Sequence, residues 1–149
     1  MPSQSRKASL WLLFGAYCLM LLWLLFLHRM DEERIPGRYN LLPWDTVNRY
    51  FWVLRHSSDP LQRRYAIANL VGNVALFLPL GFFLPALFPK LRSFAGLLLT
   101  AVALVMSVEF LQFGTGLGAL DVDDLTLNLL GILPGYVLWR IIWGKSGKT

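Results

Sequence analysis

The chain has 149 residues, of which 56% are hydrophobic and only 15% are charged. Soluble domains carry about 25% charged residues. The apolar residues here form long blocks, which excludes an ordinary soluble domain. The net charge of +5 does not indicate nucleic-acid binding. The basic residues flank the apolar blocks or fill one loop, as they do in membrane proteins.

Four apolar blocks are each long enough to cross a bilayer, because about 20 helical residues span its hydrocarbon core. We expect helices over about residues 8–27, 66–88, 93–113 and 121–143, within one domain that covers residues 1–149. The predicted fold is therefore an all-α integral membrane protein. It has about four transmembrane helices and a long loop between the first two.

The long loop holds seven arginines and five acidic residues. A short helix is predicted within it, with Asp45 as its cap and Arg55 near its end. Val47, Phe51 and Leu54 fall at i, i+4 and i+7, which suits a helix lying in the membrane interface. A solvated loop with one packed face accounts for the same pattern equally well.

The second transmembrane helix has a clear start signal and two internal breakers. Asp59 followed by Pro60 is typical of a helix cap with proline at the first helical position. Pro79 and Pro85 lie in the far half of the block, where they should kink or break the helix.

The short flanks of the blocks predict the topology. The N-terminal tail, the turn at Lys90 and Arg92, and the C-terminal tail would share one side of the membrane, and each carries basic residues. The turn that follows Gly114 carries none. The positive-inside rule therefore predicts that both termini are cytoplasmic, although the arginines of the long loop oppose this orientation.

Polar side chains from three of the blocks fall at a similar depth, roughly 5 to 10 Å inside the side opposite the termini. Polar groups in hydrocarbon are costly unless they are partnered or used. The cluster is therefore the candidate ligand-binding site. It comprises Asn69, Asn73, Glu109, Asp124 and Asn128 at this depth, together with Gln112 near the end of the third block.

The fourth block carries a stripe along one helical face. Asp121, Asp124, Asn128, Gly131 and Gly135 step by three, four, three and four residues, which places them on one side of a helix. The two glycines form a GxxxG pattern, which allows another helix to approach closely. This stripe should face the interior of the bundle.

Each of these polar residues also has a structural interpretation. The amides could be interhelical hydrogen bonds worth about 1 kcal/mol each. Glu109 could be a structural carboxyl that is paired with an arginine or held neutral. Asp121 and Asp123 are expected to be caps of the fourth helix. Four acids near one loop are a weak signal for Mg²⁺ or Ca²⁺, so we expect no metal and no cofactor.

Four segments resemble the motifs of the VanZ-like family. Residues 69–82 (NLVGNVALFLPLGF) resemble its second-helix motif, and residues 107–112 (SVEFLQ) resemble its third. Residues 121–131 (DVDDLTLNLLG) resemble the motif of its fourth helix, and residues 38–43 (RYNLLP) resemble an element of its first loop. The resemblance covers most of the chain after the first helix.

The resemblance implies a small multi-pass protein of the bacterial inner (cytoplasmic) membrane. The namesake of the family is associated with low-level resistance to teicoplanin, a glycopeptide that binds cell-wall precursors. We therefore expect an outward-facing polar pocket for an amphiphile, such as a lipid-linked precursor headgroup or a lipoglycopeptide. Arg38 would contact an anionic group of the ligand. Gly118 departs from the family pattern, where an arginine is common, so either Arg38 replaces that arginine or the function has changed.

Two other functions remain open. An intramembrane enzyme that modifies an envelope lipid would use Glu109 or Asp124 as its general acid or base, as candidate catalytic residues. A structural or partner-binding subunit would use the long loop and the GxxxG surface instead. The oligomeric state is not predicted.

Overall fold

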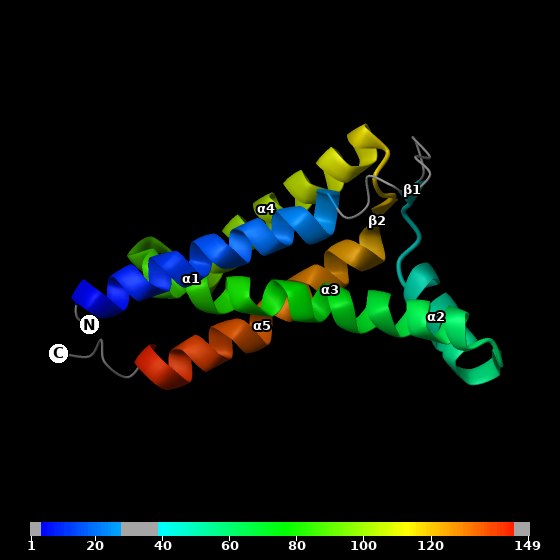
Figure 1. Ribbon diagram of the computed structural model, residues 1–149, viewed down its shortest axis with the longest axis horizontal. Helices are drawn as coiled ribbons and strands as arrows, with labels where there is room; N and C mark the ends of the chain where they lie inside the picture. Colours follow the sequence, from blue (N-terminus) through cyan, green and yellow to red (C-terminus); the bar gives the residue numbers. More distant parts are fainter. Residues whose placement is uncertain (1–3, 28–38, 145–149) are drawn as a thin grey trace.

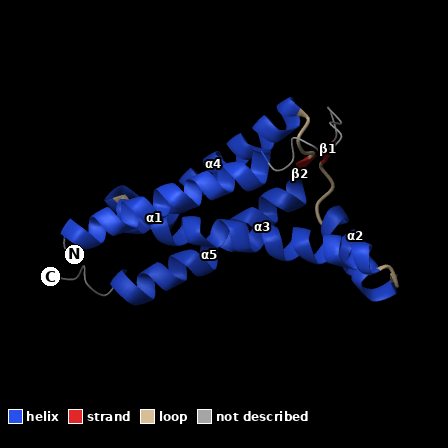
Figure 2. Ribbon diagram, viewed as in Figure 1, coloured by secondary structure: helices blue, strands red, loops and turns tan. Residues whose placement is uncertain are grey.

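The computed structural model describes residues 4–27 and 39–144, and it confirms an all-α fold (Figure 1). Only one two-stranded pairing interrupts the helices in this part of the chain (Figure 2). The elements in order are α1 (Gln4–Leu22), the π-helical turn η1 (Trp23–Leu27), β1 (Tyr39–Asn40), α2 (Asp45–His56), α3 (Pro60–Leu87), the 3-10 turn η2 (Pro89–Leu91), α4 (Phe94–Thr115), β2 (Leu120–Asp121) and α5 (Val122–Trp143).

Four helices are long and apolar enough to cross a membrane, which confirms the four predicted spans. They cover Lys7–Leu27, Pro60–Leu87, Phe94–Thr115 and Val122–Trp143. Three of these agree with the predicted bounds to within about two residues, as expected for helix ends. The second begins six residues earlier than predicted.

The early start of α3 follows from its cap. The Asp59 carboxylate accepts a hydrogen bond of 2.8 Å from the backbone N–H of Leu61, and Pro60 occupies the first helical position. This confirms the predicted start signal. The helix continues through Pro79 and Pro85 to Leu87, so neither proline ends it.

The bundle has two distinct ends (Figure 1). The start of α1, the turn between α3 and α4, and the end of α5 lie together at one end. The Trp11 ring lies 5.4 Å from the Phe88 ring, and the Tyr136 hydroxyl donates a hydrogen bond to the Arg92 carbonyl at 3.0 Å. The strands, α2 and the turn between α4 and α5 lie at the opposite end, which we call the loop end.

Helices α3 and α5 run in the same direction and pack most closely, through Gly81, Gly131 and Gly135. A Cβ atom added to Gly131 would clash with the carbonyl of Val74, and one added to Gly135 would clash with the carbonyl of Leu78. The GxxxG pattern therefore allows the close approach that was predicted, and its partner is α3 of the same chain. Gly131 and Gly135 are therefore already packed against α3.

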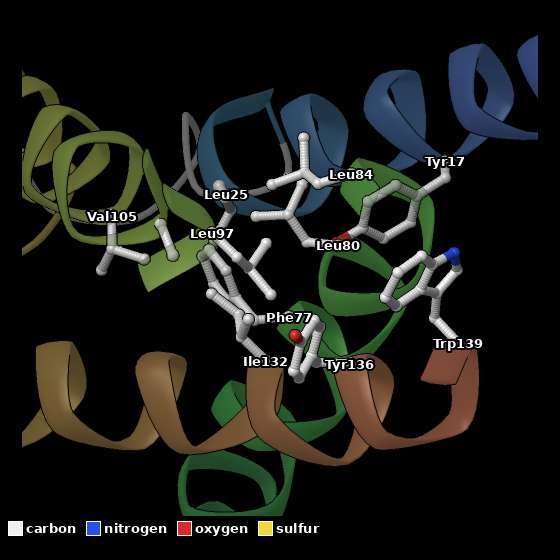
Figure 3. Close-up of a cluster of buried hydrophobic side chains, with 11 residues drawn as sticks. Tyr17, Leu25, Phe77, Leu80, Leu84, Leu97, Val105, Ile132, Tyr136 and Trp139 are labelled. Carbon is white, nitrogen blue, oxygen red and sulfur yellow. The ribbon is translucent and has the colours of Figure 1, made fainter. Parts of the chain in front are cut away.

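Apolar side chains from the four spans form one buried core (Figure 3). The Tyr17 hydroxyl donates a 2.6 Å hydrogen bond to the Leu76 carbonyl, which ties α1 to α3. This core includes Tyr17, Leu25, Phe77, Leu80, Leu84, Leu97, Val105, Ile132, Tyr136 and Trp139.

Candidate functional site

A hydrogen bond between two spans forms the centre of the candidate site. The Asn73 side-chain amide on α3 donates to the Asp124 carboxylate on α5 at 2.7 Å. Both side chains are partly buried near the loop end of the bundle. Two of the six predicted polar residues, 51 positions apart in the chain, therefore meet as their common depth predicted.

Glu109 and Asn128 are the most buried of the six polar residues, each with 3% of its surface exposed. Glu109 continues the buried face of α4, four residues after Val105. Asn128 lies four residues after Asp124 on the inward stripe of α5, and its Oδ1 has no hydrogen-bond partner among the described residues. A buried acceptor without a partner costs about 1–3 kcal/mol, so an incoming N–H or O–H donor would be stabilised there.

Two of the predicted site residues form hydrogen bonds to backbone carbonyls. The Gln112 amide donates to the Leu25 carbonyl at 3.0 Å, which joins α4 to the end of the first span, where helix carbonyls need outside donors. The Asn69 amide donates to the Tyr65 carbonyl at 2.8 Å, one turn earlier in its own helix. Arg38 lies outside the described residues.

A second polar network, which the sequence did not reveal, fastens α2 to the start of α5. The Asp123 side chain is 2% exposed. Its Oδ1 accepts from the Trp44 N–H at 2.6 Å, and its Oδ2 accepts from the Val47 N–H at 3.1 Å. These are orphan donors at the N-terminus of α2, where a carboxylate is stabilised by hydrogen bonds and by the helix dipole.

The predicted caps are correct for Asp121 and wrong for two others. Asp121 caps α5, because its carboxylate accepts from the Asp123 N–H at 2.9 Å. Asp45 is the first residue of α2 and not its cap. The cap position is Trp44, which makes no side-chain cap bond and adopts φ 68°. Asp123 serves α2 instead of its own helix, because the fold brings the two helix starts together.

A two-residue parallel pairing holds the loop before α2 in the same place. Tyr39 pairs with Leu120, and Asn40 pairs with Asp121. The Asn40 amide donates to the Thr46 hydroxyl at 2.9 Å, and that hydroxyl donates to Asp121 at 2.6 Å. A pairing this short leaves no alternation in the sequence that would predict it.

Tyr50 on α2 adds a phenol beside the site. Its ring lies 6.1 Å from the Tyr65 ring in an edge-on arrangement. Burial raises the pKa of Tyr50, and the neighbouring Tyr65 and Asp124 raise this pKa further. The Tyr50 hydroxyl is therefore a hydrogen-bond donor at neutral pH.

The side chains that gather at the loop end offer both hydrogen-bond donors and acceptors. Within residues 4–27 and 39–144 no group of three His, Cys, Asp or Glu side chains is placed to hold a metal ion. The groups that gather at the loop end are carboxylates, amides and a phenol. They can donate to and accept from a polyhydroxyl or amino headgroup.

The fold and its buried polar residues define a multi-pass α-helical membrane protein. The family model described as VanZ/LLP1 matches residues 14–143. The chain therefore belongs to the VanZ/LLP1 family. No curated protein and no solved structure matches it.

Proposed function

We propose that this VanZ/LLP1 protein of the cell envelope binds the polar headgroup of an amphiphile at Asn73, Glu109, Asp124 and Asn128. The ligand is a lipid-linked precursor or a lipoglycopeptide, and binding contributes to teicoplanin tolerance. The observation that carries this proposal is the Asn73–Asp124 hydrogen bond, with the Asn128 acceptor, unsatisfied among the described residues, one helical turn below it. Polar groups kept in a membrane interior mark sites of use.

The distribution of polarity supports a binding site over a transport path. The polar residues lie in the loop-end half of the spans, while the other half is filled by aromatic and aliphatic side chains such as Phe77, Leu97 and Trp139. A headgroup would enter from one side of the membrane, and its acyl chains would stay in the surrounding lipid.

The proposed orientation places both termini in the cytoplasm and the site on the outer face. The basic residues Lys90, Arg92 and Arg140 belong to the end that carries the termini, as the positive-inside rule expects. Envelope precursors and glycopeptides meet at the outer face, so this orientation presents the site to them.

Antibiotic susceptibility tests the proposal. A teicoplanin-sensitive strain would express wild type, Glu109→Gln, Asp124→Asn or the matched control Asn69→Ala at equal membrane levels. We expect wild type and the control to raise tolerance to teicoplanin, because the Asn69 amide donates to the Tyr65 carbonyl of its own helix. The two isosteric carboxyl variants should lose the effect. Equal tolerance from all four proteins would show that the carboxyls are not the site.

An enzymatic role is the second candidate, and the burial of Glu109 favours it. A carboxyl that is 3% exposed in an apolar helix is the kind of group that serves as a general acid or base. An enzyme predicts a modified envelope lipid in cells that overexpress wild type and not in cells that express Glu109→Gln. Identical lipid mass spectra would exclude this role.

A further inference from the structure

The outer surface of the loop end carries large apolar side chains that stay exposed among the described residues. They lie within residues 41–52, which include the connection from β1 to α2 and the first two turns of α2. Each of these side chains has roughly half or more of its surface exposed. We call them the apolar ridge: Leu41 (61%), Leu42 (68%), Trp44 (54%), Phe51 (48%) and Trp52 (60%). Exposed apolar surface of this kind marks an interaction site.

Helix α2 is apolar on two faces, and only one of them is packed. Val47 is buried and Tyr50 is half-buried against α3 and α5. Phe51 and Arg55 are four residues apart, so they lie on one side of α2, next to the packed face, and both are exposed. Packing within the chain therefore explains one face of the helix and leaves the ridge face unexplained.

The backbone that carries the ridge is firmly held. Asp123 binds the Trp44 and Val47 amides, and Asn40 accepts from the Leu42 N–H at 3.2 Å. Trp44 keeps a left-handed φ of 68°, which costs a bulky L-residue about 1–2 kcal/mol. The chain thus maintains the outward direction of these side chains against local strain.

The ridge also has a defined level along the bundle. Asp123 binds Trp44, and its neighbour Asp124 binds Asn73, so the start of the ridge lies level with Asn73 inside the α3 span. Arg55 lies about 16 Å further along α2, near the start of α3. The apolar end is therefore at the depth of the acyl boundary, and the basic end is at the depth of lipid phosphates.

The charges at the basic end of α2, near Arg55, indicate what covers the apolar ridge. Arg55, Arg63 and Arg64 are exposed, and none forms a salt bridge among the described residues. Arg49, in contrast, pairs with Asp45 at 3.0 Å. Unpaired arginines beside aromatic side chains fit a phosphate-bearing lipid surface.

We propose that the apolar ridge docks into the headgroup layer of the bilayer that holds the four spans, with Arg55 contacting the phosphate of an anionic phospholipid. Side chains of α3 such as Tyr65, Ile67 and Val71 are exposed as well. The docked α2 then fixes the wall of the polar site at the height of the headgroups. This docking does not depend on what the polar site binds.

Fluorescence quenching of single labels tests the docking. Cys18 is the only cysteine, so a Cys18→Ala background accepts a bimane label at Leu42→Cys, at Phe51→Cys, or at Asp45→Cys as the control on the polar side of α2. The full chain would be reconstituted in vesicles of phosphatidylcholine and phosphatidylglycerol. We expect lipid-borne nitroxides to quench positions 42 and 51, and aqueous iodide to quench position 45.

Two results would overturn the proposal. Iodide quenching at 42 and 51 as strong as at 45 would place the ridge in water. Disulfide formation between copies of the Leu42→Cys protein, or shielding of positions 42 and 51 from iodide without quenching by lipid nitroxides, would show that a protein covers the ridge.

A matched pair of arginine variants tests the headgroup contact. Adding phosphatidylglycerol to phosphatidylcholine vesicles should raise lipid quenching at position 51, because each basic residue near an anionic surface favours binding about fivefold. Arg55→Gln should abolish this increase, whereas Arg49→Gln should keep it because Arg49 already pairs with Asp45. Inorganic phosphate in solution should not replace the lipid. An equal loss in both variants would exclude a specific role for Arg55.

Discussion

The two ends of this bundle are stabilised by different physical means. From the middle of the bundle towards the end that carries the termini, α3 and α5 pack backbone to backbone across glycines, and the remaining space is filled by apolar side chains. At the loop end, buried carboxylates hold helix starts and loop backbone in place. Shape complementarity tolerates no added volume, whereas a hydrogen-bonded end tolerates rearrangement and can present a site. We therefore expect mutations at the two ends to have different effects on stability.

The largest effect is expected from one methyl group at the glycine contact. Gly135→Ala places a Cβ against the Leu78 carbonyl. The backbone of α3 must then move, and the free energy of unfolding should fall by about 3 kcal/mol or more. Thermal unfolding in detergent measures this loss.

Gly72→Ala is the matched control, because nothing lies within 4 Å of a Cβ added at Gly72. Replacing glycine by alanine inside a helix stabilises by about 0.5–1 kcal/mol, so this variant should melt slightly higher than wild type. Two alanine variants with equal melting temperatures would contradict the close packing of α3 on α5.

The second largest effect is expected at the loop end, from Asp123→Ala. The substitution leaves the Trp44 and Val47 amides without their carboxylate, and the loss of hydrogen bonds to a charged group costs about 2–3 kcal/mol. The effect should be local, because the apolar core lies elsewhere. Hydrogen–deuterium exchange should show faster exchange in α2 and unchanged protection in the second half of α5.

Asp45→Ala is the control for this variant. Asp45 also lies at the start of α2 and pairs with Arg49, but both side chains are at least half exposed, and a surface ion pair contributes less than about 1 kcal/mol. Exchange in α2 that rises equally in both variants would argue against the capping role of Asp123.

The sequence predicts the terminal half of this molecule better than the loop end. The spans and the GxxxG contact follow from apolar length and from spacing along one helix, so Gly131 and Gly135 could be recognised in advance. Gly81, which packs against the Ile132 carbonyl, has no pattern of its own. It could be assigned only once its partner helix was known.

The loop end depends on contacts between distant residues, and local rules misassign such contacts. Asp123 looks like a cap of its own helix, because the sequence shows which helix start is adjacent in the chain and not which one is adjacent in space. The shared depth of Asn73 and Asp124 was predictable from helical rise. The same depth argument also selected Asn69, whose amide donates to a backbone carbonyl, as the amide of Gln112 does.

A smaller effect, with the opposite sign, is expected at Asn128. Its Oδ1 is buried without a partner among the described residues, so Asn128→Leu removes an unsatisfied acceptor while keeping the volume similar. We expect the free energy of unfolding to rise by about 1 kcal/mol, while teicoplanin tolerance is lost. Melting temperature and susceptibility, measured on the same variant, check the two halves of this prediction.

Asn73→Leu provides the contrast to Asn128→Leu. The Asn73 amide donates to Asp124, so its loss should lower stability as well as tolerance. If Asn128→Leu also proved destabilising, the buried acceptor would be a structural group that is satisfied by water, and it would no longer support a ligand site.

The smallest effect is expected from the Tyr50 hydroxyl, at alkaline pH. Its pKa in the folded chain is raised by burial, with Tyr65 and Asp124 adding to the shift, so the folded chain holds this proton more tightly than the unfolded chain does. Stability from this group is complete below the unfolded pKa of about 10 and falls as pH rises beyond it. Tyr50→Phe should therefore weaken the decline of melting temperature above about pH 10. Tyr39→Phe, at an exposed position, should leave the decline unchanged, and identical slopes for both variants would mean that Tyr50 is not held protonated at the loop end.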